Sequence, residues 1–267
     1  MYTGFAIKQT SDGVVLDQNN YVQGIEIPTI DPKRSSMKHD EMDEGERSQL
    51  RKLAGSLNWA VRGTRPDLNF ELIDISTKFK SGKVEDLVRA NKAVRSLQGK
   101  KAEIFFPDMQ DPAHWILLCF TDAALGNLNN GIDSTGGHIV LLANKASGRC
   151  SALDWQSNKI KRVVKSTLAA EALSLLDGLE NCVFIRDLLK TTCTQACEIP
   201  VIAVVDNLSV VEAVHSTTAV NDKRLRRELA AIKEMLGRGE VTLVKWVPGS
   251  RQLADTLTKR GVQSQWR

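Results

Sequence analysis

Four acidic residues in the second half of the chain are placed where carboxylates could hold metal ions. Asp122 and Asp206 each follow an apolar run that predicts a buried strand, and Glu171 lies among small alanines in the strongest predicted helix. Asp255 lies in a predicted helix further along the chain. A buried carboxylate is costly unless a cation, hydrogen-bond donors or solvent stabilises it. Taken singly, Asp122 and Asp206 could each cap the next turn or helix. Asp255 could simply be an acid in the first turns of a helix, where the helix dipole stabilises negative charge.

Together, the four acids suggest metal-dependent chemistry, because strand carboxyl ends gather at one edge of an α/β sheet. Magnesium prefers oxygen ligands, and two ions can clamp both the attacking and the leaving oxygen of a phosphodiester. We therefore predict two Mg²⁺ ions, for which Mn²⁺ could substitute. Asp122 and Glu171 are expected to hold one ion. The other ion is expected at Asp122, Asp206 and Asp255.

The first third of the chain predicts short strands followed by helices. Turn-forming residues separate short apolar stretches over residues 4–27, which predicts a small N-terminal β-hairpin and a further strand at 19–27. Leucines at helical spacing then predict a helix that ends before Pro66. A second helix, capped by Asp67, is expected to reach Phe79, and a third to run from Val84 to Leu97.

From His114 onward the hydrophobic pattern changes to one typical of strands. We predict strands at 115–122, 136–143, 151–157, 199–206 and 240–247, and helices at 166–190, from 208, at 222–236 and at 251–259. The order predicts an α/β fold with a mixed five-stranded sheet flanked by helices. The first three strands are expected to be antiparallel and the last two to be added by crossovers. Two domains follow, a mostly helical region at 1–110 and this α/β domain at 111–267.

Basic and polar residues near the acids could contact nucleic acid. The candidates are Lys159, Lys161, Arg162 and Lys165 before the long helix, Arg224 and Arg227 in the later basic helix, and Ser157 and Asn207 beside the acids. If several of these cations contact phosphates, binding weakens steeply with salt. The basic groups are equally compatible with solvated helix faces, and Trp155 with a place in the core.

The segments that carry the four acids occur in the order expected of a copia-type retrotransposon ribonuclease H, which the chain resembles. They are T-D-A-A-L-G-N, S-T-L-A-A-E-A-L-S-L, V-V-D-N-L-S-V-V and W-V-P-G-S-R-Q-L-A-D-T-L-T-K, with W-Q-S-N-K after the first. Upstream, G-F-A-I-K-Q-T-S-D-G-V-V-L-D-Q-N-N-Y-V and L-R-K-L-A-G-S-L-N-W-A-V-R-G-T-R-P-D-L resemble the thumb or connection region behind the polymerase palm.

The resemblance implies a ribonuclease H-like fold in which Asp122, Glu171, Asp206 and Asp255 match the four metal-binding acids. It implies cleavage of the RNA strand of an RNA·DNA hybrid by in-line attack of water, which leaves a 3′-hydroxyl and a 5′-phosphate. As in the Pol polyprotein of such an element, the polymerase palm and fingers are the expected protein partner. The family's paired-aspartate strand is missing, because no Asp-Asp dipeptide occurs in the chain, so a polymerase centre is not expected.

Three departures from the family pattern leave the proposed metal ligands in place. The acid and tryptophan usual after the first aspartate are replaced by residues 123–126, which read A-A-L-G. Ala169 stands where the helix motif usually has a second acid. Asn221 and the three residues after it replace the His-Ile-Asp segment before the basic helix. These changes bear on rate and substrate preference.

Composition is that of a globular protein, with 42% hydrophobic and 25% charged residues and a formal net charge of +4. The absence of an 18-residue apolar run predicts no membrane span, and the N-terminal residues do not resemble a secretory signal. Five scattered cysteines, an odd number, favour a reducing compartment, so we expect an intracellular protein in cytoplasm or nucleus.

Three alternatives remain open at the level of sequence. The chain could be an inactive or co-opted retroelement fragment that serves as a nucleic-acid-binding or scaffold module. It could be a fragment of a longer polyprotein that is active only beside the polymerase domain. An integrase-like nuclease fits less well, because the essential glutamate of that family comes late in the chain, whereas Glu171 follows the third predicted strand.

Overall fold

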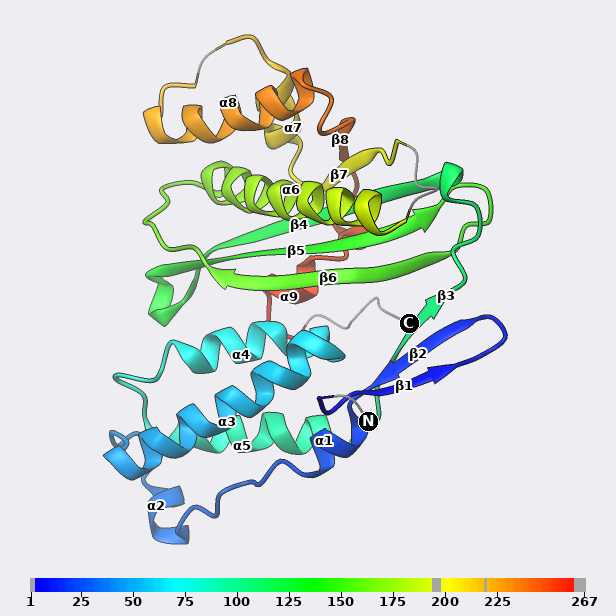
Figure 1. The fold of residues 1–267 in the computed structure, drawn as a ribbon. Helices are drawn as coiled ribbons and strands as arrows, with labels where there is room; N and C mark the ends of the chain where they lie inside the picture. The colour runs from blue at the N-terminus through cyan, green and yellow to red at the C-terminus, as the bar shows by residue number, and fades with distance from the viewer. Residues whose placement is uncertain (1–2, 194–197, 219, 262–267) are drawn as a thin grey trace. The chain divides into compact units, whose positions relative to one another are not determined.

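The computed structural model describes residues 3–193, 198–218 and 220–261. The chain divides into two compact units, Met1–Phe105 and Phe106–Arg267, which are described separately (Figure 1). The assignment of the first region to a reverse-transcriptase thumb or connection remains a prediction. No helix among the described residues is long and apolar enough to cross a membrane.

Unit 1 combines a small sheet with a group of helices. Its elements are β1 (Ala6–Gln9), β2 (Gly13–Asp17), α1 (Asn19–Gln23), α2 (Pro32–Ser36), α3 (Glu44–Gly63), α4 (Asn69–Ser76) and α5 (Val84–Gln98), and the unit ends within β3 (Glu103–Pro107). The predicted hairpin is formed by β1 and β2, which pair antiparallel, and β3 extends their sheet at the β2 edge. Leucines such as Leu50, Leu57 and Leu87 are fully buried where α3 packs against α5.

Three expectations for unit 1 were wrong. Residues 19–23 form helix α1 instead of a strand, since Asp17 at the end of β2 accepts a hydrogen bond from the backbone of Asn19 and turns the chain. Asp67 does not cap α4, because its carboxylate is engaged by the guanidinium of Arg65 at 2.7 Å. Strand β3 was not predicted within a region assigned to helices.

Unit 2 contains a mixed five-stranded sheet flanked by helices, which confirms the predicted fold class. Its elements are β4 (Trp115–Leu128), β5 (Asp133–Asn144), β6 (Cys150–Lys159), α6 (Thr167–Thr192), β7 (Val201–Val205), α7 (Leu208–His215), α8 (Lys223–Gly237), β8 (Leu243–Trp246) and α9 (Asp255–Thr258). The strand order is β6-β5-β4-β7-β8. As expected, β4, β5 and β6 are antiparallel, whereas β7 and β8 are added in parallel.

Helix α6 and helix α9 contact opposite faces of this sheet (Figure 1). Gly178 of α6 lies so close to the sheet that an added Cβ would stand 2.7 Å from Thr121 and 3.0 Å from His138. Gly137, the neighbour of His138 on β5, points to the other face, where an added Cβ would lie 2.9 Å from the Cβ of Leu257 in α9. Both helices are thereby held against the centre of the sheet.

Two boundaries in unit 2 differ from the sequence prediction. Asp122 does not end its strand, because β4 continues past it and pairs with β5 without interruption to Ala124 and Thr135, then again at Leu128 and Asp133 after a register shift. Only the pairing of β4 with β7 stops earlier, at Phe120. The predicted last helix at 251–259 is in fact a 3-10 turn at Gly249–Arg251 followed by the short α9, which begins at Asp255.

Candidate metal centre

Three of the four predicted acids meet at the sheet edge where β7 ends. Asp122 of β4, Glu171 of α6 and Asp206, directly after β7, place one carboxylate oxygen each within 4.8 Å of the others. Asp122 and Glu171 are buried, whereas Asp206 is partly exposed. The cluster is therefore open to solvent on the side of Asp206.

Glu171 is held in the cluster by the close packing of α6 on the sheet. Its neighbours Ala170 and Ala172 are fully buried, and the backbone of Ala123 donates a hydrogen bond to its carboxylate. Among the described residues, Oε2 of Glu171 has no hydrogen-bond partner. Burial, reinforced by the charge of Asp122, raises the pKa of Glu171 to about 9.

Burial also raises the pKa of Asp122, but by less than that of Glu171. Burial raises its pKa to about 6, against the lowering effects of a hydrogen bond from Thr258 and the charge of Lys259. The hydroxyl of Thr258 donates to Oδ2 of Asp122, and Nζ of Lys259 lies 3.7 Å from the same oxygen. Two residues on and just after α9 thus partly satisfy a carboxylate on β4.

The backbone of Asp206 is held in place by a hydrogen bond from the neighbouring strand. The indole Nε1 of Trp246, on the adjacent strand β8, donates to the carbonyl oxygen of Asp206 at 3.0 Å. Burial raises the pKa of the Asp206 carboxyl, and Lys259 acts in the opposite direction. Gly249 packs against this carboxylate, because an added Cβ would lie 3.3 Å from Oδ2.

Asp255 is not one of the three acids that converge. Its carboxylate forms an ion pair with Lys259, four residues further along. The segment around it is anchored to the sheet by Gln252, whose side chain donates to the carbonyl oxygen of Thr121 at 2.9 Å. Sequence reasoning missed Gln252, Thr258 and Lys259, although all three belong to the quoted motif that ends in A-D-T-L-T-K.

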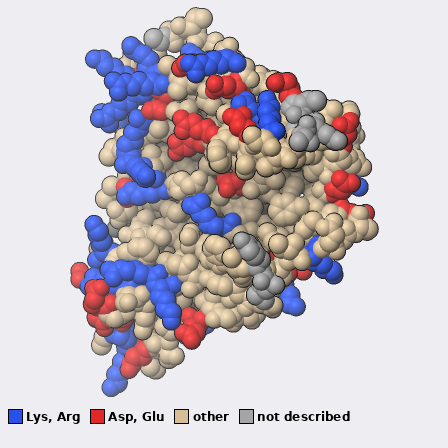
Figure 2. All heavy atoms as spheres, viewed as in Figure 1, with Lys and Arg blue, Asp and Glu red and all other residues tan. Residues whose placement is uncertain are grey.

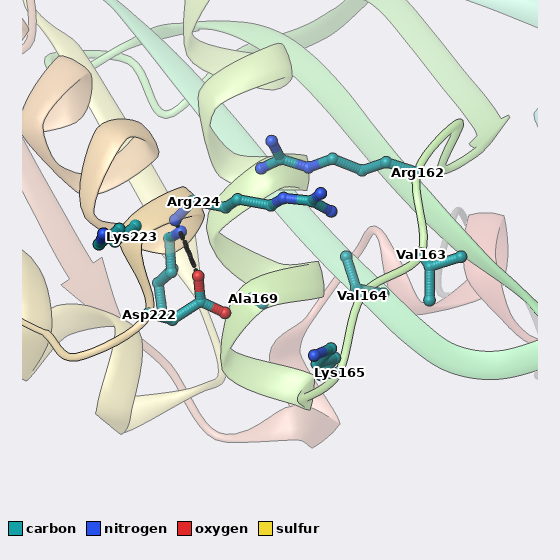
Figure 3. Close-up of a pocket in the computed structure, with 9 residues that line it drawn as sticks. Arg162, Val163, Val164, Lys165, Ala169, Asp222, Lys223 and Arg224 are labelled. Atoms are coloured by element: carbon teal, nitrogen blue, oxygen red, sulfur yellow. Dashed lines mark hydrogen bonds between the residues drawn. The ribbon is translucent and has the colours of Figure 1, made fainter.

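A basic cavity lies between the β6–α6 loop and the start of α8, with Ala169 of α6 in its lining. It has a volume of about 510 Å³, and its charged lining residues are Arg162, Lys165, Asp222, Lys223 and Arg224. Arg162 and Arg224 extend toward each other across it (Figure 3). Asp222 is engaged as the N-cap of α8, where it accepts a hydrogen bond from the backbone of Arg224 at 2.8 Å. The cavity is suited to an anion.

The remaining predicted contacts are dispersed. Lys161 lines a neighbouring groove of about 780 Å³ between α6 and β6, and Arg227 is exposed on α8. Lys159 is paired with Asp133 at 2.6 Å, and Arg162 is paired with Glu228 at 2.7 Å. Each of these two cations therefore already has a partner.

The two polar candidates differ in their surroundings. Ser157 is 1% exposed, and its hydroxyl has no hydrogen-bond partner among the described residues. Asn207 caps helix α7 by accepting a hydrogen bond from the backbone of Ser209 at 3.0 Å. Trp155 is buried, as expected for a core residue.

Positive side chains gather over the part of unit 2 where the β6–α6 loop and the first turns of α8 lie (Figure 2). This surface includes the mouth of the basic cavity. Positive charge beside a cluster of acids is expected where a polyanion approaches a cation-binding centre.

The donor set of the cluster fits a hard divalent cation. All three side chains offer carboxylate oxygens, and at least two of the acids are buried without an arginine partner among the described residues. The unpartnered Oε2 of Glu171 is an acceptor that a cation would satisfy. Asp122, Glu171 and Asp206 are thus the residues that would hold a metal ion.

Solved structures that resemble this chain include ribonuclease H1 proteins. LC11-RNase H1, isolated from compost by a metagenomic approach, is 19% identical, with a TM-score of 0.40 over 54% of this chain and 92% of that one. RNase H1 of the halophilic archaeon Halobacterium salinarum is 17% identical, with a TM-score of 0.37 over 53% and 93%. No protein-family model and no curated protein matches the sequence. The function is therefore inferred from this chain's own residues.

Proposed function

We propose that this chain is a metal-dependent ribonuclease H, which cleaves the RNA strand of an RNA·DNA hybrid. The observation that carries the proposal is the convergence of Asp122, Glu171 and Asp206, two of them buried, at one edge of the sheet. Buried acids that repel one another are retained at a cost to the fold, which a bound cation offsets. We further propose two Mg²⁺ ions, with Asp255 joining the cluster when they bind.

Each residue has a definite task in this proposal. Asp122, Glu171 and Asp206 would hold the metal, and Mg²⁺ would stabilise the negative charge that develops on the attacked phosphate. Thr258 orients the Asp122 carboxylate through its hydroxyl, and Trp246 fixes the backbone of Asp206. These two hydrogen bonds keep the carboxylates aimed at one point.

The basic cavity supplies the binding site for the second strand. Arg224 and Lys165 line it from two different elements, so they can approach a phosphate from opposite sides. Ala169, which lines the cavity, stands two residues before Glu171 on α6, so the first turns of this helix contribute both to the cavity and to the metal centre. A duplex with one strand at each place fits this arrangement.

A labelled hybrid tests the proposal. The wild-type protein should cut the RNA strand in Mg²⁺ and stop in chelator, whereas Asp206→Asn should lose roughly a hundredfold or more of the rate. Asp187→Asn, which neutralises an exposed acid on α6, is the matched control and should cleave normally. Equal cleavage by Asp206→Asn and the wild type would refute the assignment of Asp206 to the metal centre. Hybrid binding without any cleavage by the wild type would favour the scaffold alternative.

We also propose that the chain works within a copia-type reverse transcriptase, beside a polymerase palm and fingers inside the cell. The quoted motifs support this context. Joining the chain to the palm and fingers of a copia-type polymerase should raise the cleavage rate and restore polymerisation. Unchanged cleavage in the joined protein would count against the context while leaving the nuclease proposal intact.

A further inference from the structure

Lys259 is a cation already in place at the acidic cluster. We propose that its ammonium group takes the position of a second metal ion between Asp122 and Asp255, so that the substrate-free protein holds one ion tightly, and the second of the two proposed ions enters only when Lys259 moves away. This inference rests on the proposed metal centre. It assigns to Lys259 control over how many ions the centre accepts.

The contacts of Lys259 support this role. Its Nζ forms an ion pair with Oδ1 of Asp255 and lies 3.7 Å from Oδ2 of Asp122. A pair four residues apart is common at the end of a helix, but Asp122 comes from a different element and its side chain is only 2% exposed. The ammonium group therefore joins two acids, from β4 and α9, that the sequence predicted to share a metal ion.

The balance of charge points the same way. Four carboxylates lie in or next to the cluster, and the described residues place one ammonium group, that of Lys259, in contact with them. One divalent ion together with Lys259 offsets most of that negative charge. A second divalent ion at Asp122 and Asp255 would have to displace a cation that is already paired there, and like charges at this separation repel strongly.

The local electrostatics hold Lys259 in its charged form. A lysine is charged at neutral pH, and this one lies against two carboxylates, those of Asp122 and Asp255. The side chain is 44% exposed, which leaves it room to swing away into solvent. The ammonium group of Lys259 can thus leave the two carboxylates without unfolding of the site.

Calorimetric titration with Mn²⁺ alone, on the full chain without nucleic acid, tests the proposal. The wild type should bind one ion tightly, whereas Lys259→Met should bind the first ion roughly tenfold more tightly or better and gain a second equivalent. Lys259→Arg keeps the charge and should retain the wild-type stoichiometry. Lys245→Met, on the exposed side of β8, is the matched control and should titrate like the wild type.

The result that overturns the proposal is a single ion with unchanged affinity in Lys259→Met, or a loss of binding in that variant. Should Lys259→Met fail to fold, Lys259→Gln carries the same comparison, and wild-type titration by it would equally overturn the role of Lys259. Absence of Mn²⁺ binding in the wild type would instead refute the metal centre itself, so the two failures are distinguishable.

Discussion

Both units bury acidic side chains, but they stabilise them in opposite ways. In unit 1, Glu46 pairs with Arg34 at 2.9 Å, and Asp86 pairs with Arg89 at 3.4 Å. The hydrogen bond from Arg34 lowers the pKa of Glu46. In unit 2, burial raises the pKa of Glu171 to about 9. Buried acids with an arginine partner are structural, whereas buried acids that repel one another mark a place where a cation is expected.

The largest expected effect separates the two kinds of buried acid by activity. Asp122→Asn should reduce Mg²⁺-dependent cleavage of a hybrid by roughly a thousandfold, because it removes a carboxylate shared by the metal centre. Asp86→Asn should leave the rate within about twofold and lower the free energy of unfolding by about 1–3 kcal/mol. Rates measured at saturating hybrid check both, and a comparable loss of activity in the two variants would erase the distinction.

The second prediction distinguishes buried acids with an arginine partner from those in the metal cluster by their effect on stability. Without metal at pH 8, Glu171→Gln should raise the free energy of unfolding by about 1–3 kcal/mol, since a neutral amide removes the cost of protonating this carboxyl on folding. Glu46→Gln should lower it by about 1–2 kcal/mol, since it leaves Arg34 without its ion pair. Urea unfolding of both variants measures the two signs. A destabilised Glu171→Gln protein would mean that the cluster is already satisfied without metal.

The third prediction concerns pH. Because the pKa of Glu171 rises from 4.5 to about 9 on folding, the folded protein holds the extra proton and its contribution to stability is lost as pH rises through that range. Asp122, with a folded pKa of about 6, adds to the fall at lower pH. The metal-free protein should thus lose stability between about pH 5 and pH 9. Saturating Mg²⁺ or Glu171→Gln should flatten the curve, and a metal-free curve that rises over this range would contradict the assignment.

The last prediction compares one glycine from each unit, Gly137 and Gly55. Gly137→Ala should cost about 1–3 kcal/mol, because the new Cβ would stand 2.9 Å from Leu257 and push α9 off the sheet. Gly55→Ala, in the middle of α3 with no described atom within 4 Å of the new Cβ, should add about 0.5–1 kcal/mol. Thermal melting compares them directly. Equal shifts would show that the close approach of α9 to β5 does not matter.

Much of unit 2 could be predicted from sequence because β4, β5 and β7 contain apolar runs, β6 alternates, and the long helix has a clear cap. Ser166, where the helix was predicted to begin, is its N-cap and accepts a hydrogen bond from the backbone of Ala169. The full length of β4 could not be predicted from the sequence, since the small residues after Asp122 show no strand pattern. They are held in the strand by pairing with β5. Tertiary pairing decided that boundary.

The site could be predicted only as a set of acids. The convergence of Asp122, Glu171 and Asp206 follows from strand order and could be anticipated. The pairing of Asp255 with Lys259 could not, because a lysine four residues after an acid usually forms a surface pair. The burial of Asp122 beneath that pair is a property of the folded sheet alone.

The measurement that tests the central claim most directly is anomalous diffraction from crystals of the protein grown with Mn²⁺. A peak about 2.1–2.3 Å from carboxylate oxygens of Asp122, Glu171 and Asp206 is the predicted result. Crystals of Glu171→Gln grown in the same way should show a weakened peak or none. A wild-type map without a peak among these three acids, at a Mn²⁺ concentration that supports hybrid cleavage, would contradict the account.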